Sequence, residues 1–236
     1  MSTIVVTGAG SGIGRAVAHR FAAEGWQVAV VGRRSAALEE TIALAAEGSG
    51  SRMAALPCDI SDPESVSAMG AAVHERFGDV DVLVNSAGIN VPQRGLAVLS
   101  NADWHGVLAT NLHGAYYCVQ AFLPRMRERR TGTIVNINSD VGKVARDISG
   151  AAYVASKFAL RGLTQQINAE ERAHGIRACS ICPRDVNTPL LDKRPQPPPP
   201  DVRARMLQPE DLAACVWLVA TLPPRVVLDE ISLSTR

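Results

Sequence analysis

The sequence has little of several features that indicate a secreted, membrane-spanning or nucleic-acid-binding protein. Only five of its 236 residues are cysteine, too few and too scattered for a disulfide framework. The longest apolar stretch, around residues 212–222, is too short to cross a bilayer, and no charged segment followed by an apolar one opens the chain. Lysine plus arginine number 24 against 23 aspartates plus glutamates, so no strong field attracts nucleic acid or a membrane. We therefore expect a cytoplasmic protein that binds neither.

Cys179 and Cys182 form a C-x-x-C spacing, which has two interpretations. One is a redox or zinc site, and the other is a pair of small core residues in a buried strand. Positions i and i+3 of a strand point to opposite faces, and no second cysteine pair exists to complete a zinc site. We favour the buried strand and predict no metal site.

Short apolar runs alternate with longer helical patterns along the whole chain, and 47% of the residues are apolar. We expect strands at 3–7, 27–32, 52–58, 80–85, 133–138, 176–182 and 230–233. We expect helices at 12–24, 35–47, 63–77, 101–129, 151–174 and 209–220. This alternation predicts an α/β fold, a doubly wound parallel sheet of about seven strands with helices on both faces, in a single domain over residues 1–236.

Residues 184–207 interrupt the alternation with Pro195 and with four consecutive prolines at 197–200. Prolines in such a run exclude a regular helix and favour polyproline II. The segment is either a stiff surface spacer or a lid over a ligand site. It leaves the carboxyl end of a predicted strand, where open α/β sheets bind ligands, so we favour a substrate lid.

A glycine-rich loop lies between the first expected strand and the first expected helix, with the spacing Gly8-x-x-x-Gly12-x-Gly14. Glycines allow backbone N–H groups to approach a pyrophosphate, and a helix N-terminus favours its negative charge. The spacing differs from G-x-G-x-x-G, although the strand–turn–helix setting is the one a dinucleotide site requires.

Arg33 and Arg34 follow the second expected strand, which ends at Gly32. NAD-binding folds often place a carboxylate here to hold ribose hydroxyls, whereas an arginine fork binds a 2′-phosphate. A solvated basic helix start is the alternative, and it opposes the helix macrodipole. The sequence therefore favours NADP(H) over NAD(H). Asp59 either accepts from the adenine amino group or acts as a turn residue ahead of Pro63, and both interpretations stay open.

Tyr153 and Lys157 stand four residues apart in an expected helix, where positions i and i+4 share one face. A lysine charge about 4 Å from the phenol supplies about 4 kcal/mol at an effective dielectric constant of about 20. That is the amount needed to move a tyrosine pKa from about 10 to about 7. We expect a tyrosine that donates or accepts a proton near neutral pH. The alternative is a surface helix with a solvated lysine.

Several motifs in order resemble the short-chain dehydrogenase/reductase family, over Thr3 to about Thr188. The glycine loop resembles the family's cofactor loop. The sequence Asn85-Ser86-Ala87-Gly88 resembles its Asn-Asn-Ala-Gly motif, with serine at the second position. The segment Pro183 to Thr188 resembles its Pro-Gly-x-Val-x-Thr segment, with Arg184 replacing the glycine. The resemblance implies a single-domain Rossmann fold.

The resemblance also implies a role for each matching side chain. Tyr153 would be the general acid in carbonyl reduction and the base in alcohol oxidation, while Lys157 would lower its pKa and hold the nicotinamide ribose. Ser139 would bind the substrate oxygen, and Asn111 would position a water that joins Lys157 to solvent. The implied catalytic residues are Asn111, Ser139, Tyr153 and Lys157. The expected cofactor-binding residues are Gly8, Ser11, Gly12, Ile13, Gly14, Arg33, Arg34, Asp59, Ile60, Asn85, Ala87, Gly88, Tyr153, Lys157, Pro183, Val186 and Thr188.

These motifs predict an NADP(H)-dependent oxidoreductase that interconverts a small ketone or aldehyde and an alcohol. The last residues, 227–236, look more like the tail of small carbonyl reductases and 3-hydroxy acid dehydrogenases than that of acyl-carrier-protein reductases. A 3-oxoacyl reductase and a catalytically silent NADP-binding regulator remain alternatives, whereas a hydrolase lacks its G-x-S-x-G elbow. Arg146 and Arg184 either recognise an acidic substrate or are solvated, which we favour. The resemblance also implies a homodimer or homotetramer.

Overall fold

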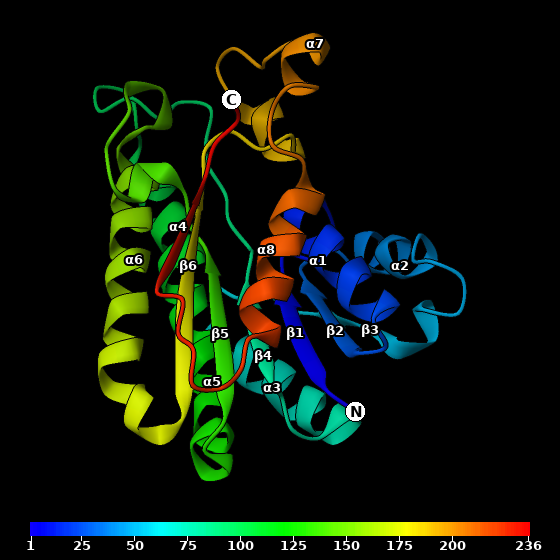
Figure 1. Ribbon diagram of the computed structural model, residues 1–236. Helices are drawn as coiled ribbons and strands as arrows, with labels where there is room; N and C mark the ends of the chain where they lie inside the picture. Colours follow the sequence, from blue (N-terminus) through cyan, green and yellow to red (C-terminus); the bar gives the residue numbers. More distant parts are fainter.

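The computed structural model describes residues 1–236 and contains one sheet of seven parallel strands in the order β3-β2-β1-β4-β5-β6-β7 (Figure 1). The strands are β1 (Thr3–Thr7), β2 (Gln27–Gly32), β3 (Met53–Pro57), β4 (Val82–Asn85), β5 (Gly132–Ile137), β6 (Ile176–Pro183) and β7 (Glu230–Leu233). The chain moves outward from β1 to β3 and then returns to β4 on the other side of β1. The strand order therefore reverses between β1 and β4, which is where open α/β sheets bind ligands.

Helices cover both faces of the sheet, as predicted. They are α1 (Gly12–Ala23), α2 (Ser35–Ala43), α3 (Pro63–Phe77), α4 (Asn101–Leu108), α5 (Gly114–Arg129), α6 (Ala151–Glu171), α7 (Pro200–Arg203) and α8 (Pro209–Thr221). Within β1, Ile4 packs into one apolar cluster with α1 and α8, while Val5 packs into the other with α3 and α5. Consecutive strand residues face opposite sides, so the continuous apolar runs of the sequence fill two cores. No helix has the length and apolarity needed to span a membrane.

The single helix expected over 101–129 is divided into α4 and α5 by a π-helical turn at Ala109–His113. A π turn has one residue more than a turn of α-helix, because its hydrogen bonds join residues five apart. Asn111 lies inside this turn and is buried. Wide turns of this kind occur frequently at functional sites, because they reorient one side chain without ending the helix.

Two helices end three or more residues before the sequence-based boundaries. The helix expected to reach residue 47 ends at Ala43, and the chain turns through Gly48 with φ of 73°. The helix expected to reach residue 174 ends at Glu171, followed by a 3₁₀ turn and by Gly175 with φ of 78°. A residue with positive φ cannot continue a right-handed helix, so the helix ends there. Glycine adopts this conformation without a steric penalty.

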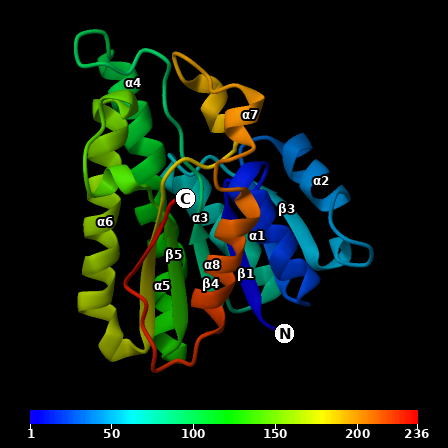
Figure 2. The ribbon, with the colours of Figure 1, turned by 45° about the horizontal axis from the view of Figure 1, so that its top comes forward.

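The proline-rich segment contains more helix than predicted. It forms a 3₁₀ turn at Pro189–Lys193 and the one-turn helix α7, which corrects the expectation that no regular helix occurs there. Pro200 stands at the first helical position, where the missing N–H is harmless. The segment closes on itself, since Val186 and Leu207 form an isolated parallel bridge. Both views show α7 at the end of the molecule where the strands have their carboxyl ends (Figures 1 and 2).

Candidate active site

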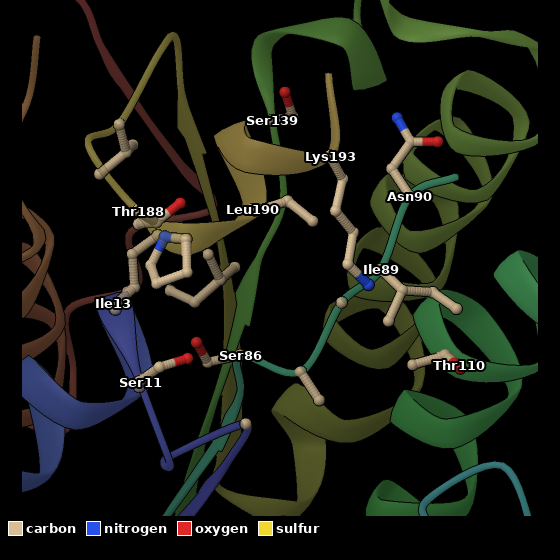
Figure 3. A pocket seen from close by; sticks show the side chains of 18 of the residues that line it. Ser11, Ile13, Ser86, Ile89, Asn90, Thr110, Ser139, Thr188, Leu190 and Lys193 are labelled. Atoms are coloured by element: carbon tan, nitrogen blue, oxygen red, sulfur yellow. The ribbon is translucent and has the colours of Figure 1, made fainter. Parts of the chain in front are cut away.

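A cavity of about 880 Å³ lies at the carboxyl ends of the strands, beside the point where the strand order reverses. The loops that follow β1 to β6, the start of α6 and the proline-rich segment line it. All the predicted site residues line this cavity except Asn85 and Asn111. In Figure 3, Ser11, Ile13 and Thr188 lie on one side of the cavity and Ile89, Asn90 and Thr110 on the other.

The glycine loop is shaped by a close approach of two strand ends. Gly8 has φ of 67°, and a Cβ there would lie 2.7 Å from the Cα atom of Ala87. A Cβ at Gly14 would lie 2.5 Å from the Gly8 carbonyl oxygen. The Thr7 hydroxyl accepts from the amides of Ser86 and Ala87 at 3.1 and 3.2 Å, which fixes β1 against β4. Only glycine fits positions 8 and 14 of this backbone.

The first turn of α1 presents unneutralised N–H groups to the cavity. Ser11 is the N-cap residue, its side chain caps no backbone group, and no acidic residue occurs in the first turn. Gly12 lies against Thr188, whose Cγ2 atom would be 3.1 Å from a Cβ at that position. The arrangement suits a negatively charged group, because these backbone donors and the helix dipole have no competing anion.

Arg33, Arg34 and Asp59 line the cavity beyond the ends of β2 and β3. Both arginines are exposed, and neither forms an ion pair. Asp59 Oδ1 accepts from the amide and the hydroxyl of Ser61 at 3.0 and 2.7 Å, which is the turn role weighed for it. Although partial burial opposes it, the Ser61 hydrogen bonds and nearby Arg33 hold the Asp59 pKa below its usual value. Its side chain still borders the cavity.

Asn85 does not line the cavity, and its contact with a cofactor stays a prediction. Its amide donates to Asn136 Oδ1 at 2.9 Å, between neighbouring strands, and Asn136 in turn donates to Thr164 of α6 at 2.8 Å. The side chain is 4% exposed. Asn85 therefore joins β4 to β5. The residues after it, Ser86 to Gly88, line the cavity.

Tyr153 and Lys157 lie together on α6 and both line the cavity. Lys157 Nζ is 5.5 Å from the centre of the Tyr153 ring and donates to the Ile137 carbonyl at 2.8 Å. The lysine is 4% exposed, and burial lowers its pKa to about 8. The helical spacing therefore brings the pair together as predicted.

The expected downward shift of the tyrosine pKa is not found. The pKa of Tyr153 is raised to about 12, because burial and, to a lesser extent, Asp140 raise it more than Ser139, Arg194 and Arg94 lower it. The sequence-based argument placed a full lysine charge about 4 Å away at a surface-like dielectric. In the structure, burial penalises the phenolate more than Ser139, Arg194 and Arg94 stabilise it.

Ser139 follows β5 and faces the cavity (Figure 3). Its hydroxyl donates to Asp140 Oδ1 at 3.1 Å and accepts from the Val141 amide at 3.4 Å. Its own amide donates to Asn138 Oδ1 at 3.0 Å, and Asn138 donates to Ser180 of β6. These bonds hold the backbone at position 139 from two strands.

Asn111 is hydrogen-bonded to the loop that follows β4. Its Oδ1 atom accepts from the Ile89 amide at 2.8 Å, and its Nδ2 atom donates to the Ile89 carbonyl at 3.0 Å and to Ser156 Oγ at 3.1 Å. Ile89 lines the cavity. The π turn thus aims a buried amide at the loop after β4 and fastens it to α6.

A row of alternating charges crosses the mouth of the cavity. Arg146 donates to Asp140 at 2.6 Å and lies 4.0 Å from Asp185, which also pairs with Arg194 of the proline-rich segment. The row joins the loop after β5, the loop after β6 and the segment 184–207. Arg146 is thus ion-paired inside the site rather than simply solvated as favoured. Arg184 is exposed with no ion pair, and its backbone has no positive φ, so the replaced glycine was not required.

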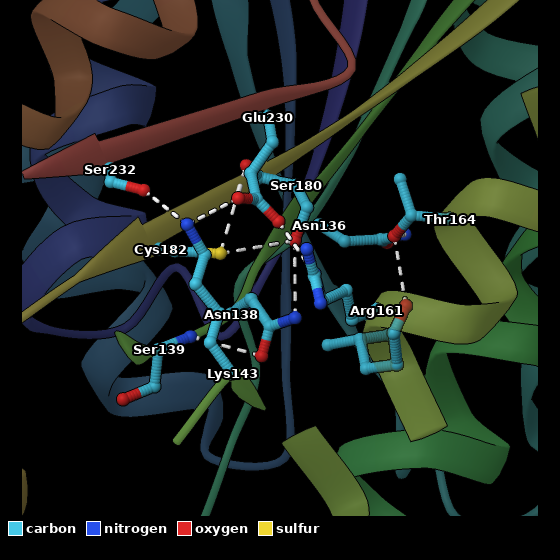
Figure 4. Close-up of polar contacts among 11 residues, drawn as sticks. Asn136, Asn138, Ser139, Lys143, Arg161, Thr164, Ser180, Cys182, Glu230 and Ser232 are labelled. Atoms are coloured by element: carbon cyan, nitrogen blue, oxygen red, sulfur yellow. Dashed lines mark hydrogen bonds and ion pairs between the residues drawn. The ribbon is translucent and has the colours of Figure 1, made fainter. Parts of the chain in front are cut away.

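The last strand is anchored by a second polar cluster (Figure 4). Glu230 of β7 pairs with both Lys143 and Arg161, and Lys143 also donates to Ser232. These contacts join the loop after Ser139 to α6 and β7. Cys179 and Cys182 of the neighbouring β6 are buried free thiols, which agrees with the core interpretation.

Sequence reasoning missed several residues of the cavity wall. Ser86, Ile89, Asn90, Arg94, Leu190, Leu191, Lys193 and Arg194 line it although no motif marks most of them. Arg194 and Lys193 belong to the segment predicted to cover the site. Arg94 carries no sequence signal, because its position depends on contacts with distant parts of the chain.

The chain matches the family model described as "short chain dehydrogenase" over residues 2–198. It is 37% identical over 205 residues to a 3beta-hydroxysteroid dehydrogenase of Mediterraneibacter gnavus, covering 87% of this chain and 72% of that protein.

Solved structures agree in fold. An alcohol dehydrogenase from Thermococcus sibiricus, complexed with 5-hydroxy-NADP, superposes with a TM-score of 0.88 at 30% identity, covering 100% of this chain and 97% of the other. A 3-ketoacyl-(acyl-carrier-protein) reductase from Brucella melitensis, complexed with NADH, gives a TM-score of 0.89 at 26% identity, covering 99% and 96%. Together with the cavity at the reversal of strand order, these matches establish that the chain is an oxidoreductase of the short-chain dehydrogenase/reductase family.

Proposed function

We propose that this oxidoreductase interconverts a small ketone or aldehyde and its alcohol with NADP(H), and that Tyr153 transfers the proton. The observation that carries the proposal is the meeting of Tyr153, Lys157 and Ser139 at the wall of one cavity whose other end has the glycine loop and the start of α1. One cavity thus provides a place for a dinucleotide and groups for proton transfer. Hydride transfer itself is the chemistry that the nicotinamide supplies.

The choice of NADP(H) rests on Arg33 and Arg34. Both border the cavity, lack an ion pair and follow β2, so they would bind the 2′-phosphate of a dinucleotide held along the glycine loop. No carboxylate at the end of β2 repels such a phosphate. The solved neighbour with 5-hydroxy-NADP is consistent with this choice, while the neighbour with NADH has the same fold. The arginines rather than the fold therefore decide the preference.

The proton would pass between Tyr153 and the substrate oxygen. The phenol is protonated at neutral pH because its pKa is raised to about 12, which suits donation to the alkoxide formed by hydride addition. Ser139 would donate a second hydrogen bond to the same oxygen after leaving Asp140. Lys157 would hold the nicotinamide ribose, and Asn111 would position a water that joins Lys157 to solvent. The segment 184–207 would act as the lid that excludes water.

Two other activities compete with this proposal. A 3-oxoacyl reductase uses the same chemistry on a larger substrate, and a ketoacyl reductase is among the structural neighbours. A silent NADP-binding regulator would keep the cofactor half of the cavity alone. The retained Tyr153, Lys157 and Ser139 disfavour the regulator, because binding a cofactor does not require a protonatable phenol beside the substrate space.

The test follows NADPH absorbance with a panel of ketones, oxo acids and acyl thioesters. We expect turnover by the wild type, and a loss of at least about 1,000-fold in Tyr153→Phe with NADPH affinity unchanged. Tyr117→Phe is the matched control, because Tyr117 is a tyrosine of α5 outside the cavity. Tight NADPH binding without turnover of any compound would instead support the regulator.

We also propose that the protein self-associates through α4, α5 and α6. Tyr116 of α5 and Phe158 of α6 expose 45% and 44% of their surface, which supports a contact there. A sedimentation-velocity measurement is expected to give a dimer or tetramer. A monomer at all concentrations would remove this proposal and leave the proposed reaction untouched.

A further inference from the structure

The substrate end of the cavity holds more cationic side chains than carboxylates. The carboxylates there are Asp140 and Asp185, and they pair with Arg146 and Arg194. The cations are Arg94, Arg146, Lys157, Arg184, Lys193 and Arg194. Arg184 and Lys193 are exposed and can be solvated by water. Arg94 and Lys157 remain as cations that are buried and have no carboxylate partner, and Lys157 already has a proposed role at the nicotinamide ribose.

Arg94 retains unused hydrogen-bond donors. It is 8% exposed, donates from Nε to the Val91 carbonyl at 2.7 Å, and donates from Nη2 to the Lys193 carbonyl. A guanidinium has five N–H donors, so three have no protein partner, including both on Nη1. Buried charged side chains are nearly always paired with an opposite charge or fully hydrogen-bonded. A buried guanidinium with free donors therefore suggests a site for an anionic ligand.

Arg177 shows how this protein treats a buried arginine that is purely structural. It is 9% exposed and has no carboxylate, yet it donates to the Thr133 hydroxyl and to the carbonyls of Pro223, Val226, Ala220 and Leu222. Its five donors have five acceptors. The unfilled donors of Arg94 are therefore not the general condition of buried arginines in this fold.

Arg94 lines the cavity, and its unpartnered end is not fully enclosed by protein. The fully buried side-chain atoms without partners belong to Asn85, Arg129 and Arg146. Nη1 of Arg94 is not among them, so the protein does not fully enclose it, and the Arg94 residue itself lines the cavity. Tyr153 and Arg94 are close enough for each to affect the other's pKa, and burial lowers the pKa of Arg94.

The structure holds Arg94 next to Tyr153 by specific packing. A Cβ at Gly150, just before α6, would lie 2.5 Å from the Arg94 Cβ atom, and the Gly150 backbone has φ of 78°. The Ala151 amide donates to the Arg94 carbonyl at 3.4 Å, and Asn90 donates to the Ser149 carbonyl at 2.9 Å. Arg94 is thus fixed at the start of the helix that carries Tyr153. Lys193, whose carbonyl accepts from Arg94, points its side chain toward Ile89 (Figure 3).

We propose that Arg94 binds a carboxylate of the substrate, so that the enzyme acts on oxo acids and hydroxy acids in preference to uncharged ketones and alcohols. The proposal rests on the proposed carbonyl–alcohol function and names its substrate class. The carboxylate accepts from Nη1 and from the free hydrogen of Nη2, and the reacting carbonyl then lies toward Tyr153. Charge-assisted hydrogen bonds of this kind are the strongest that a substrate can gain here.

The experiment compares each acid with its uncharged ester. We would measure kcat/KM with NADPH for acetoacetate against methyl acetoacetate and for pyruvate against methyl pyruvate, using wild type, Arg94→Gln and Arg94→Lys. Arg94→Gln is expected to lose about 10- to 100-fold on the acids and less than about threefold on the esters. Arg94→Lys is expected to recover part of the loss, because it restores the charge without the fork.

Equal losses on acid and ester would show that Arg94 only holds the lid through the Lys193 carbonyl, and would overturn the proposal. The same conclusion follows if Arg184→Gln, and not Arg94→Gln, removes the preference for acids. Arg205→Gln, an arginine of the same segment that is exposed and outside the cavity, is the control.

A binding measurement separates this inference from the proposed function. Butanoate and butanamide would be titrated into the protein–NADPH complex while the cofactor fluorescence is followed. Binding of butanoate that is lost in Arg94→Gln supports the carboxylate site even if no compound is reduced, in which case the proposed reaction fails alone. Reduction of acids and esters with no dependence on Arg94 contradicts the carboxylate site and leaves the reaction standing.

Discussion

The Ser139 hydroxyl donates to Asp140 at 3.1 Å, and Asp140 is in turn bound by Arg146 at 2.6 Å. The serine hydroxyl proton is therefore directed toward Asp140. Asp140 also raises the pKa of Tyr153. Asp140, which belongs to none of the family motifs, thus affects both Ser139 and Tyr153.

Replacing Asp140 by asparagine is expected to lower the pH at which the enzyme oxidises alcohols. A nearby anion disfavours the phenolate, so its removal lowers the Tyr153 pKa. The measurement is the pH profile of kcat/KM for oxidation, whose rising limb should move to lower pH in Asp140→Asn. Asp147→Asn, at an exposed position of the same loop, is the control. An unmoved limb would show that Asp140 does not act on the proton-transfer step.

The two reaction directions are expected to differ in pH dependence. Because the Tyr153 pKa is raised above 10.0, the phenol stays protonated through neutral pH and can donate. Reduction should therefore change little between about pH 6 and pH 8, while oxidation, which needs the phenolate, should rise steadily with pH. Initial rates in both directions with saturating cofactor test this. An oxidation rate that is already at its plateau at pH 7 would mean that the tyrosine pKa is lowered in the working enzyme, as the sequence argument expected from Lys157.

Lys157→Met is expected to stabilise the protein at neutral pH by about 1–3 kcal/mol, although it removes a residue of the proposed active site. Burial lowers the pKa of Lys157 to about 8 in the folded protein, against 10.5 for a free lysine. At neutral pH the buried ammonium is therefore charged at a free-energy cost, which opposes folding. The lost hydrogen bond to Ile137 offsets part of the gain.

The sign of this effect can be followed by pH. Between about pH 8 and pH 10.5 the unfolded chain binds more protons at Lys157 than the folded protein, so wild-type stability gains from rising pH. Urea unfolding without cofactor should therefore show the advantage of Lys157→Met below pH 8 and its decline above. A variant less stable than wild type at pH 7 would show that the ammonium is not penalised by burial.

Arg33→Ala is expected to raise the KM for NADPH by about 10- to 100-fold and the KM for NADH by less than about threefold. The arginine borders the cavity without an ion pair, so its main partner would be the 2′-phosphate. Steady-state kinetics with both cofactors measure this. Arg225→Ala, at an exposed arginine outside the cavity, provides the control. Equal rises for both cofactors would mean that Arg33 does not contact a 2′-phosphate.

The sheet and most of the cavity wall follow from local sequence patterns. Gly8 and Gly14 mark a backbone that passes close to another strand, and the helical spacing of Tyr153 and Lys157 brings both side chains to one wall. Such features are predictable because they depend on a few neighbouring residues and on the period of the element.

Other features depend on contacts between distant residues. Asn85 faces its neighbour strand because of the register with Asn136, and the π turn at Asn111 is stabilised by Ile89 and Ser156. Arg94 is placed by Gly150 and by a carbonyl 99 residues away in the chain. The tyrosine pKa was mispredicted for the same reason, since the depth of burial cannot be read from the spacing of two residues.

The transfer of deuterium from labelled NADPH tests the central claim most directly. Acetoacetate, or whichever ketone the wild type reduces, would be incubated with NADPH deuterated on one or the other face of nicotinamide carbon 4, and the alcohol analysed by mass spectrometry. We predict that one of the two labels appears once at the carbinol carbon with wild type and that no labelled alcohol forms with Tyr153→Phe. An alcohol formed without label from either cofactor, or labelled at the wild-type rate by Tyr153→Phe, would contradict the account.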